Sequence, residues 1–274
     1  MNHVQGQGGY KNLDISLLES RINETGWLKA HIYEQVTSTN DVVIENLSGV
    51  VSGRGIVAIA DEQTQGRGRL DRKWSAPAGS GIAMSIGIKV QDFPSQLSAI
   101  PLMCGLAVIR TLEKFSISAA LKWPNDVVFT TTNSNHRQQI SYELRKVGGI
   151  LVQLIQDNLV IGIGLNVDLK YEDLPVEHAT SLYLEGYEID RHELISKLLE
   201  EINFLRNENF NWLEDYKNFC VTIGKNISVK GVSGETITGQ AVDVLSTGAL
   251  VIKNLENLYQ ITIGDVEHLD VNRD

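Results

Sequence analysis

A short polar loop between two apolar segments limits how this chain can fold. Residues 55–61 and 81–90 are apolar and rich in isoleucine and valine, so each predicts a buried strand. Between them, residues 61–75 concentrate four cations, two glycines and a tryptophan, namely Arg67, Arg69, Arg72, Lys73, Gly66, Gly68 and Trp74. Glycines let a ligand approach the backbone, and guanidinium groups match phosphate oxygens. The loop therefore suits a phosphate-bearing ligand, and a solvated basic loop anchored by Trp74 is the alternative.

Two further segments combine polar side chains with a break in regular structure. Ser38, Thr39 and Asn40 lie between a predicted strand at 31–36 and a predicted helix, where capping alone would explain them. Residues 122–126 read KWPND, and the proline there interrupts a strand, which would expose the neighbouring side chains to a cleft. A lysine at this position can neutralise phosphate, and the Asn-Asp pair offers oxygens that Mg²⁺ prefers beside nucleotide phosphates. A purely structural turn is the alternative.

A lysine also stands at the mouth of a predicted antiparallel pair of strands. Lys146 opens an apolar strand over 147–154, and a turn leads into a second strand over 159–167 that ends near Asn166. From these residues alone, Lys146 is either a cation for an anionic ligand or an edge residue whose amine reaches solvent.

Together these motifs resemble those of the biotin protein ligases, in the order of that family. GRGRLDRKW resembles the family's GRGRxxRxW signature, KWPND its nucleotide and metal segment, and Lys146 with 148–152 its K-x-[AG]-G-I-L-V strand. Residues 38–40 and 162–166 occupy two more family positions, so the resemblance covers residues 38–166. It implies an enzyme that activates biotin with ATP to biotinyl-5′-AMP and transfers it to a lysine of a biotin carboxyl carrier protein, that of acetyl-CoA carboxylase or another biotin enzyme.

The resemblance also assigns site residues. It implies catalytic roles for Lys146, Arg67, Arg69 and Lys122. It implies biotin contacts from Ser38, Thr39, Asn40, Gln63, Gly66, Arg67, Gly68, Arg69, Lys146 and Gly149. It implies nucleotide contacts from Arg69, Arg72, Trp74, Lys122, Asn125 and Asn166, and magnesium ligands in Asp126 and Asn125. ATP with Mg²⁺ and biotin would be substrates, and no tightly bound prosthetic group is expected.

The expected fold is α/β (α+β): a mixed, largely antiparallel sheet with helices on one face, like class II synthetases and biotin-lipoyl ligases. Apolar periodicity predicts helices over 13–23, 95–115 and 191–213. Five short β-rich pieces separated by glycines follow, over 227–232, 236–245, 249–253, 258–262 and 266–269. They indicate a small barrel, and the resemblance supplies an SH3-like C-terminal domain. We expect an N-terminal segment at 1–30, a catalytic domain at 31–216 and the barrel at 217–274.

Charge and composition weigh against other function classes. A net charge of -10 opposes a general nucleic-acid binder using the RG-rich loop, because such proteins need a basic surface. A lipoate or octanoate ligase of the same fold is the nearer alternative, which the two main motifs disfavour.

Fewer than forty residues precede Ser38, too few for a winged helix-turn-helix, so we expect no DNA binding. With no signal peptide and no apolar run of about 20 residues, a cytoplasmic protein without membrane contact is expected. Oligomeric state, a homodimer included, stays open, as do the roles of Asp71 and of a polar excursion at 130–145.

Overall fold

The computed structural model describes residues 10–25, 28–70, 72–93, 95–130, 144–206, 210–231, 234–255 and 257–269. Asp71 and most of the predicted excursion at 130–145 lie outside these ranges. In the described ranges, no helix combines the length and apolar character that a membrane crossing requires.

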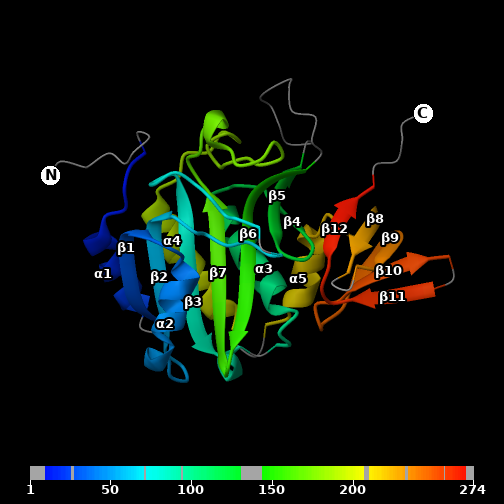
Figure 1. Ribbon diagram of the computed structural model, residues 1–274, viewed down its shortest axis with the longest axis horizontal. Helices are drawn as coiled ribbons and strands as arrows, with labels where there is room; N and C mark the ends of the chain where they lie inside the picture. Colours follow the sequence, from blue (N-terminus) through cyan, green and yellow to red (C-terminus); the bar gives the residue numbers. More distant parts are fainter. Residues whose placement is uncertain are drawn as a thin grey trace.

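A seven-stranded mixed sheet forms the larger part of the molecule (Figure 1). Its strands lie in the order β1-β2-β3-β7-β6-β5-β4. Their bounds are β1 Leu28–Val36, β2 Gly55–Gln63, β3 Gly81–Lys89, β4 Ala120–Lys122, β5 Asp126–Thr130, β6 Leu144–Ile155 and β7 Asn158–Asn166. Only β1 and β2 pair in parallel, and the other neighbours are antiparallel. The predicted mixed, largely antiparallel sheet is confirmed.

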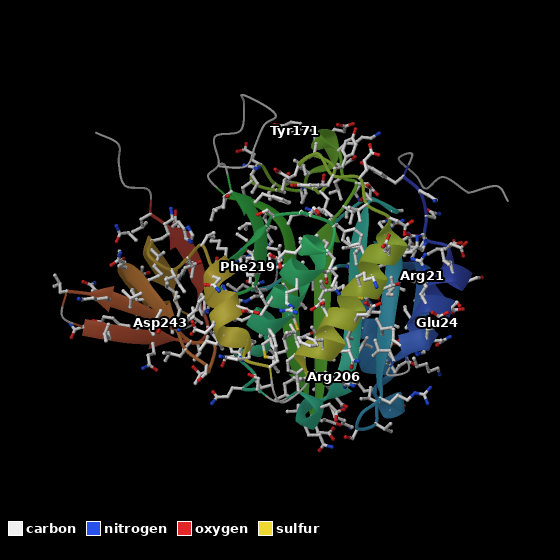
Figure 2. The ribbon with its side chains drawn as sticks, turned by 180° about the vertical axis from the view of Figure 1, so that it is seen from behind. Arg21, Glu24, Tyr171, Arg206, Phe219 and Asp243 are labelled. Carbon is white, nitrogen blue, oxygen red and sulfur yellow. The ribbon has the colours of Figure 1, made fainter. Side chains whose placement is uncertain are left out.

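The three long helices cover one face of this sheet, as expected, and a short helix covers the other. Figure 2, seen from behind, shows α3 (Ile100–Glu113) and α4 (Arg191–Leu205) lying across the sheet. With α1 (Ile15–Thr25), they bury the side chains of β2 that point their way, such as Val57 and Ile59. The alternate side chains, Ile56 and Ala58, pack instead against α2 (Thr39–Glu45) on the opposite face. Because β2 is apolar on both faces, it needs cover on both sides.

The prediction of one helix over 191–213 is wrong, because α4 ends at Leu205 and α5 spans Trp212–Phe219. Residues 206–211 read RNENFN, and asparagine is a poor helix former that favours caps and turns. Asn211 is the N-cap residue of α5. In the part of the chain that the structure describes, the remaining helical turns are three short 3₁₀ segments at Leu47–Gly49, Val90–Asp92 and Tyr171–Asp173.

The last part of the chain forms a second, five-stranded antiparallel sheet in the order β11-β10-β9-β8-β12. Its strands are β8 Asn226–Lys230, β9 Thr236–Val244, β10 Leu250–Asn254, β11 Asn257–Ile261 and β12 Asp265–His268, close to the five predicted pieces. The sheet is joined to the first by the Trp123 indole, whose Nε1 donates to Gly248 O at 3.0 Å. Val221 N also donates to Leu121 O at 2.9 Å. The second sheet is therefore fastened beside β4.

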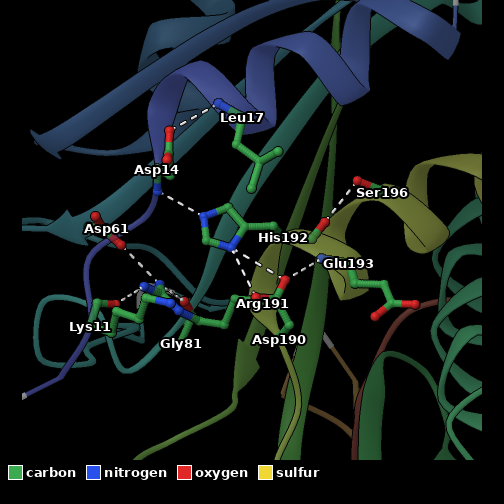
Figure 3. Close-up of polar contacts among 10 residues, drawn as sticks. All are labelled: Lys11, Asp14, Leu17, Asp61, Gly81, Asp190, Arg191, His192, Glu193 and Ser196. Atoms are coloured by element: carbon green, nitrogen blue, oxygen red, sulfur yellow. Dashed lines mark hydrogen bonds and ion pairs between the residues drawn. The ribbon is translucent and has the colours of Figure 1, made fainter. Parts of the chain in front are cut away.

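Arg191 is a buried cation that joins four segments of the chain (Figure 3). Its Nη1 donates to Asp61 Oδ1 and to Gly81 O, both at 2.9 Å, and its Nη2 donates to Lys11 O. Asp61 also accepts from Leu13 N at 2.9 Å. The side chains of Arg191 and Asp61 are 5% and 4% exposed, so this pair is shielded from solvent.

Replacing Arg191 with methionine should lower the free energy of unfolding by about 3–5 kcal/mol, because the Asp61 carboxylate would stay buried without its partner. Urea denaturation followed by circular dichroism measures this. Lys197→Met, on the same helix, removes a cation from the exposed pair with Glu200 and should cost less than about 1 kcal/mol. Equal effects of the two substitutions would contradict the structural role of Arg191.

Candidate functional site

A pocket of about 220 Å³ opens on the face of the sheet that carries α2, between the strand ends and the RG-rich loop. Most of the predicted site residues line it: Ser38, Thr39, Asn40, Gln63, Arg67, Gly68, Arg69, Arg72, Trp74, Asn125, Asp126, Lys146, Gly149 and Asn166. Lys122 lies instead in an adjoining pocket of about 150 Å³, which shares Arg72, Asn125, Asp126 and Lys146 with the first. Gly66 lines neither of the two.

One end of the pocket is a buried network of hydroxyl and amide groups. Gln63 Oε1 accepts from Thr39 N at 2.8 Å and from Thr39 Oγ1 at 3.1 Å. Ser85 Oγ lies 2.6 Å from Thr39 Oγ1 and donates to Asn40 Oδ1 at 2.5 Å, and Asn40 Nδ2 donates to Gln153 Oε1 at 2.7 Å. The N-cap residue of α2, Ser38, makes no side-chain capping bond. Helix capping alone therefore does not account for this polar cluster.

At the other end, Lys146 turns its amine inward and not towards solvent. Its Nζ donates to Asp126 Oδ1 at 2.5 Å. The backbone is held in register because Lys146 N donates to His178 O and Lys146 O accepts from Thr180 N, both at 2.8 Å. A side chain at Gly149 would place its Cβ 3.3 Å from this Nζ, so glycine leaves the amine its space. An edge lysine reaching for solvent would show none of these constraints.

The loop arginines are each engaged by a partner around the pocket. Arg67 pairs with Asp41 at 2.7 Å, and Arg72 pairs with Asp265 at 2.6 Å. Arg69 donates to Asn125 Oδ1 and to Gly264 O, both at 3.1 Å. Burial lowers the pKa of Arg69, and the nearby Asp265 and Asp126 oppose that shift.

Two glycines allow the loop to fold down onto the sheet. The Trp74 indole lies so close to β7 that a Cβ on Gly164 would sit 2.5 Å from its Cε2. At the start of the loop, a Cβ on Gly66 would sit 2.3 Å from Trp74 O. The backbone closes here, since Trp74 N donates to Gly66 O at 2.9 Å and Gly68 N donates to Arg72 O at 2.7 Å. Any other residue at these two positions would push the loop away from the pocket.

Asn166 brings an unsatisfied acceptor to the pocket wall. It is 3% exposed, and its Nδ2 donates to Thr180 O at 2.9 Å. Within the described residues, its Oδ1 is buried without a hydrogen-bond partner. Such an atom is costly in an empty site, and a ligand hydroxyl or amine would satisfy it.

The structure adds pocket residues that the sequence analysis missed. Ser85 was detectable as a single hydroxyl inside an apolar strand, but Asp265 carried no local signal. Gln153 carried none either, and it acts on the pocket only through its hydrogen bond with Asn40. His178 lines both pockets, and its pKa is lowered by burial and by the cations Lys146 and Lys122. The apolar part of the wall includes Met84.

The pocket offers few side-chain oxygens that could bind a divalent cation. In the described ranges, no group of three or more His, Cys, Asp or Glu side chains is arranged to hold a metal. One carboxylate oxygen of Asp126 accepts a hydrogen bond from Lys146. Asn125 Oδ1 accepts from Arg69, and Asn125 Nδ2 donates to Ile150 O. One carboxylate beside cations suits Mg²⁺ that arrives with phosphates, and not a cage made by protein alone.

Together these features form a pocket suited to an anionic molecule with a polar head. A buried network of donors and acceptors lies at one end, and lysine and arginine side chains lie at the other. In a site partly closed to water, such cations stabilise phosphate and carboxylate charge more strongly than they would in solvent.

Comparison with known proteins matches both parts of the chain. Residues 32–169 match the model of the biotin/lipoate A/B protein ligase family, and residues 222–269 match that of the biotin protein ligase C-terminal domain. The chain is 31% identical to the biotin--[acetyl-CoA-carboxylase] ligase of Mycobacterium tuberculosis, covering 89% of this chain and 91% of that one. It is 28% identical to the bifunctional ligase/repressor BirA of Bacillus subtilis, covering 86% of this chain and 73% of the relative. A solved biotin protein ligase from Aquifex aeolicus in complex with biotin and ATP superposes with a TM-score of 0.72 at 30% identity, covering 87% of this chain and 97% of that one.

Gly164→Ala should displace the Trp74 indole, because the added Cβ would fall 2.5–2.9 Å from its ring atoms. We expect the tryptophan emission of the variant to move to longer wavelength as the ring becomes more exposed to water. The same substitution in a Trp74→Phe background should leave the emission unchanged. A shift of equal size in that background would place the disturbance elsewhere.

Proposed function

This chain belongs to the biotin/lipoate A/B protein ligase family and is an ATP-dependent biotin protein ligase, and we propose that the pocket between the RG-rich loop and the sheet is where its reaction occurs. The single observation that carries this assignment is the juxtaposition of the Thr39–Asn40–Gln63 network with the Lys146 and Arg69 cations in one pocket. Biotin has the matching shape, a polar ureido ring joined by an apolar chain to a carboxylate.

The ureido ring belongs at the buried network. Its carbonyl and N–H groups need donors and acceptors within an otherwise apolar pocket, and Ser38, Thr39, Asn40 and Gln63 offer both. Gly68 and Gly149 would leave room for biotin in this channel, Gly66 would let the loop close over it, and the alkyl chain would pass along Met84. The carboxylate would then reach Lys146 with Arg67 and Arg69.

The first step brings two anions together, so it depends on cations that are in place beforehand. An oxygen of the biotin carboxylate bonds to the α-phosphorus of ATP, and the bond to pyrophosphate breaks. Lys146, Arg69 and Lys122 would stabilise the charge that develops on the phosphate oxygens. In the second step, the neutral amine of a carrier lysine attacks the acyl carbon, loses a proton to solvent and expels AMP.

The remaining assignments concern the nucleotide. Trp74 would offer its face to adenine, Arg72 would meet phosphate, and the orphaned Oδ1 of Asn166 would accept from a ribose hydroxyl. Asp126 would hold Mg²⁺ that arrives with ATP, and the metal would neutralise phosphate charge. Asn125 stays a proposed ligand, although its oxygen already accepts from Arg69. No tightly bound prosthetic group is part of this scheme.

The acceptor protein and the cellular location are also proposals. The Mycobacterium tuberculosis relative is named for ligation of biotin to acetyl-CoA carboxylase. We propose that the acceptor here is likewise a biotin carboxyl carrier protein and that the reaction takes place in the cytoplasm. The net charge of -10 repels the DNA backbone, so we expect any affinity for DNA to be weak. The lipoate or octanoate alternative is not favoured, because the C-terminal match is to biotin protein ligases.

Pyrophosphate release with ATP-Mg²⁺ tests the assignment, with biotin, lipoate and octanoate offered in parallel. We expect release with biotin and little with the other two acids, because only biotin carries a ureido ring for the buried network. Release with lipoate and not with biotin would overturn the proposal.

Lys146→Ala should slow adenylate formation about tenfold to a hundredfold, because a charged hydrogen bond of roughly 1.5–3 kcal/mol is lost at the reacting anions. Lys89→Ala is the matched control, since Lys89 also pairs with an aspartate at a strand end but lies outside the pocket. Pyrophosphate release at saturating biotin measures both variants. Normal activity of Lys146→Ala would show that its amine does not act on substrate.

A further inference from the structure

The RG-rich loop is fastened to the second sheet at the turn before β12. Arg69 Nη2 donates to Gly264 O at 3.1 Å, and Arg72 Nη2 lies 2.6 Å from Asp265 Oδ2. Asp265 lines both pockets, although it is nearly two hundred residues away from the loop in sequence. A site built on the first sheet is therefore closed in part by the second.

The anchor on the second sheet is firmly packed. Asp265 begins β12, which pairs with β8 from Asp265↔Lys230 to His268↔Ile227. The next residue, Val266, is 6% exposed. Gly264 lies so close to β8 that a Cβ there would sit 2.6 Å from Val229 Cγ1. The turn thus offers the loop a fixed point.

The tip of the RG-rich loop has fewer contacts with the first sheet than with the turn before β12. Arg67 and Trp74 hold the two ends of the loop, through Asp41 and through contact with Gly164. Within the described residues, the side chains of its tip, Arg69 and Arg72, make one hydrogen bond towards the first sheet, from Arg69 to Asn125 in the turn between β4 and β5. The Gly264–Asp265 turn supplies the tip's other partners.

We propose that Asp265 is a positioning residue that latches the loop tip over the pocket and so retains the acyl-adenylate until a carrier lysine arrives. This inference rests on the proposed function and deepens it. Asp265 acts through Arg72, because a carboxylate has no favourable contact with the phosphate of the intermediate. Loss of the latch leaves Lys146 and Lys122 in place but lets the loop tip with Arg69 and Arg72 open more often, which shortens the lifetime of the bound intermediate.

The test compares Asp265→Asn with Glu267→Gln, which removes the same charge from an exposed position on the same strand. Synthetic biotinyl-AMP is bound to each full-length protein, and its dissociation is followed after dilution. The off-rate of Asp265→Asn should rise about two- to fivefold, the range expected for a half-exposed ion pair. Glu267→Gln should match the wild type. Biotin transfer to an unrelated lysine-bearing protein should rise with the same ratio, because released adenylate reacts in solution.

Salt separates the latch from general damage to the turn. Screening shortens from about 10 Å at 0.1 M to about 3 Å at 1 M salt, so the off-rate of the wild type should approach that of Asp265→Asn at 1 M KCl. A difference that persists undiminished at 1 M KCl, or an Asp265→Asn off-rate equal to that of Glu267→Gln at low salt, overturns the latch. Because the adenylate is supplied ready-made, a failure of the protein to make it from biotin and ATP counts against the proposed function alone.

Discussion

The ion pair between Arg191 and Asp61 underlies the geometry of the whole pocket. One guanidinium nitrogen bonds both to the Asp61 carboxylate near the end of β2 and to the Gly81 carbonyl at the start of β3. These two points are where the chain enters and leaves the region that holds the RG-rich loop. A buried charge is tolerated only with a well-placed partner, so the pair holds the two strand ends at a fixed separation. The loop can therefore return to the sheet in few ways, and Trp74 rests against Gly164 in one of them.

The pocket also balances its own charge before any substrate binds. Lys146 is paired with Asp126, Arg67 with Asp41 and Arg72 with Asp265. Each partner keeps a cation in position at the cost of competing with the incoming anion. For Lys146 the competition is most direct, because the 2.5 Å contact lies inside the pocket. In the proposed function Asp126 would also hold Mg²⁺, so the Lys146 amine and the metal would share one carboxylate.

Division of the pocket between two sheets separates recognition of the acid from retention of the intermediate. The polar network around Thr39 and Ser85 lies on the first sheet and is nearly closed to solvent, so it is suited to selecting the acid. The loop tip that covers the phosphate end depends on a turn of the second sheet. Binding of the ring and release of the intermediate can thus vary separately, because different parts of the chain control them.

Local patterns were enough to predict much of this protein. The apolar strands around the loop and the five short C-terminal strands follow from periodicity and turn residues, which act over a few neighbouring residues. The grouping of Lys146 with the RG-rich loop came from the resemblance to biotin protein ligases and not from these patterns. Sequence periodicity failed at 191–213, where Asn-rich residues divide two helices, and it did not predict that α2 lies on the face opposite α3 and α4. Nor could it reveal that Asp265 meets Arg72, that Gln153 meets Asn40, or that Arg191 joins the ends of two strands. Those contacts join residues more than a hundred positions apart, and only the packing of the two sheets, α2 and α4 brings them together.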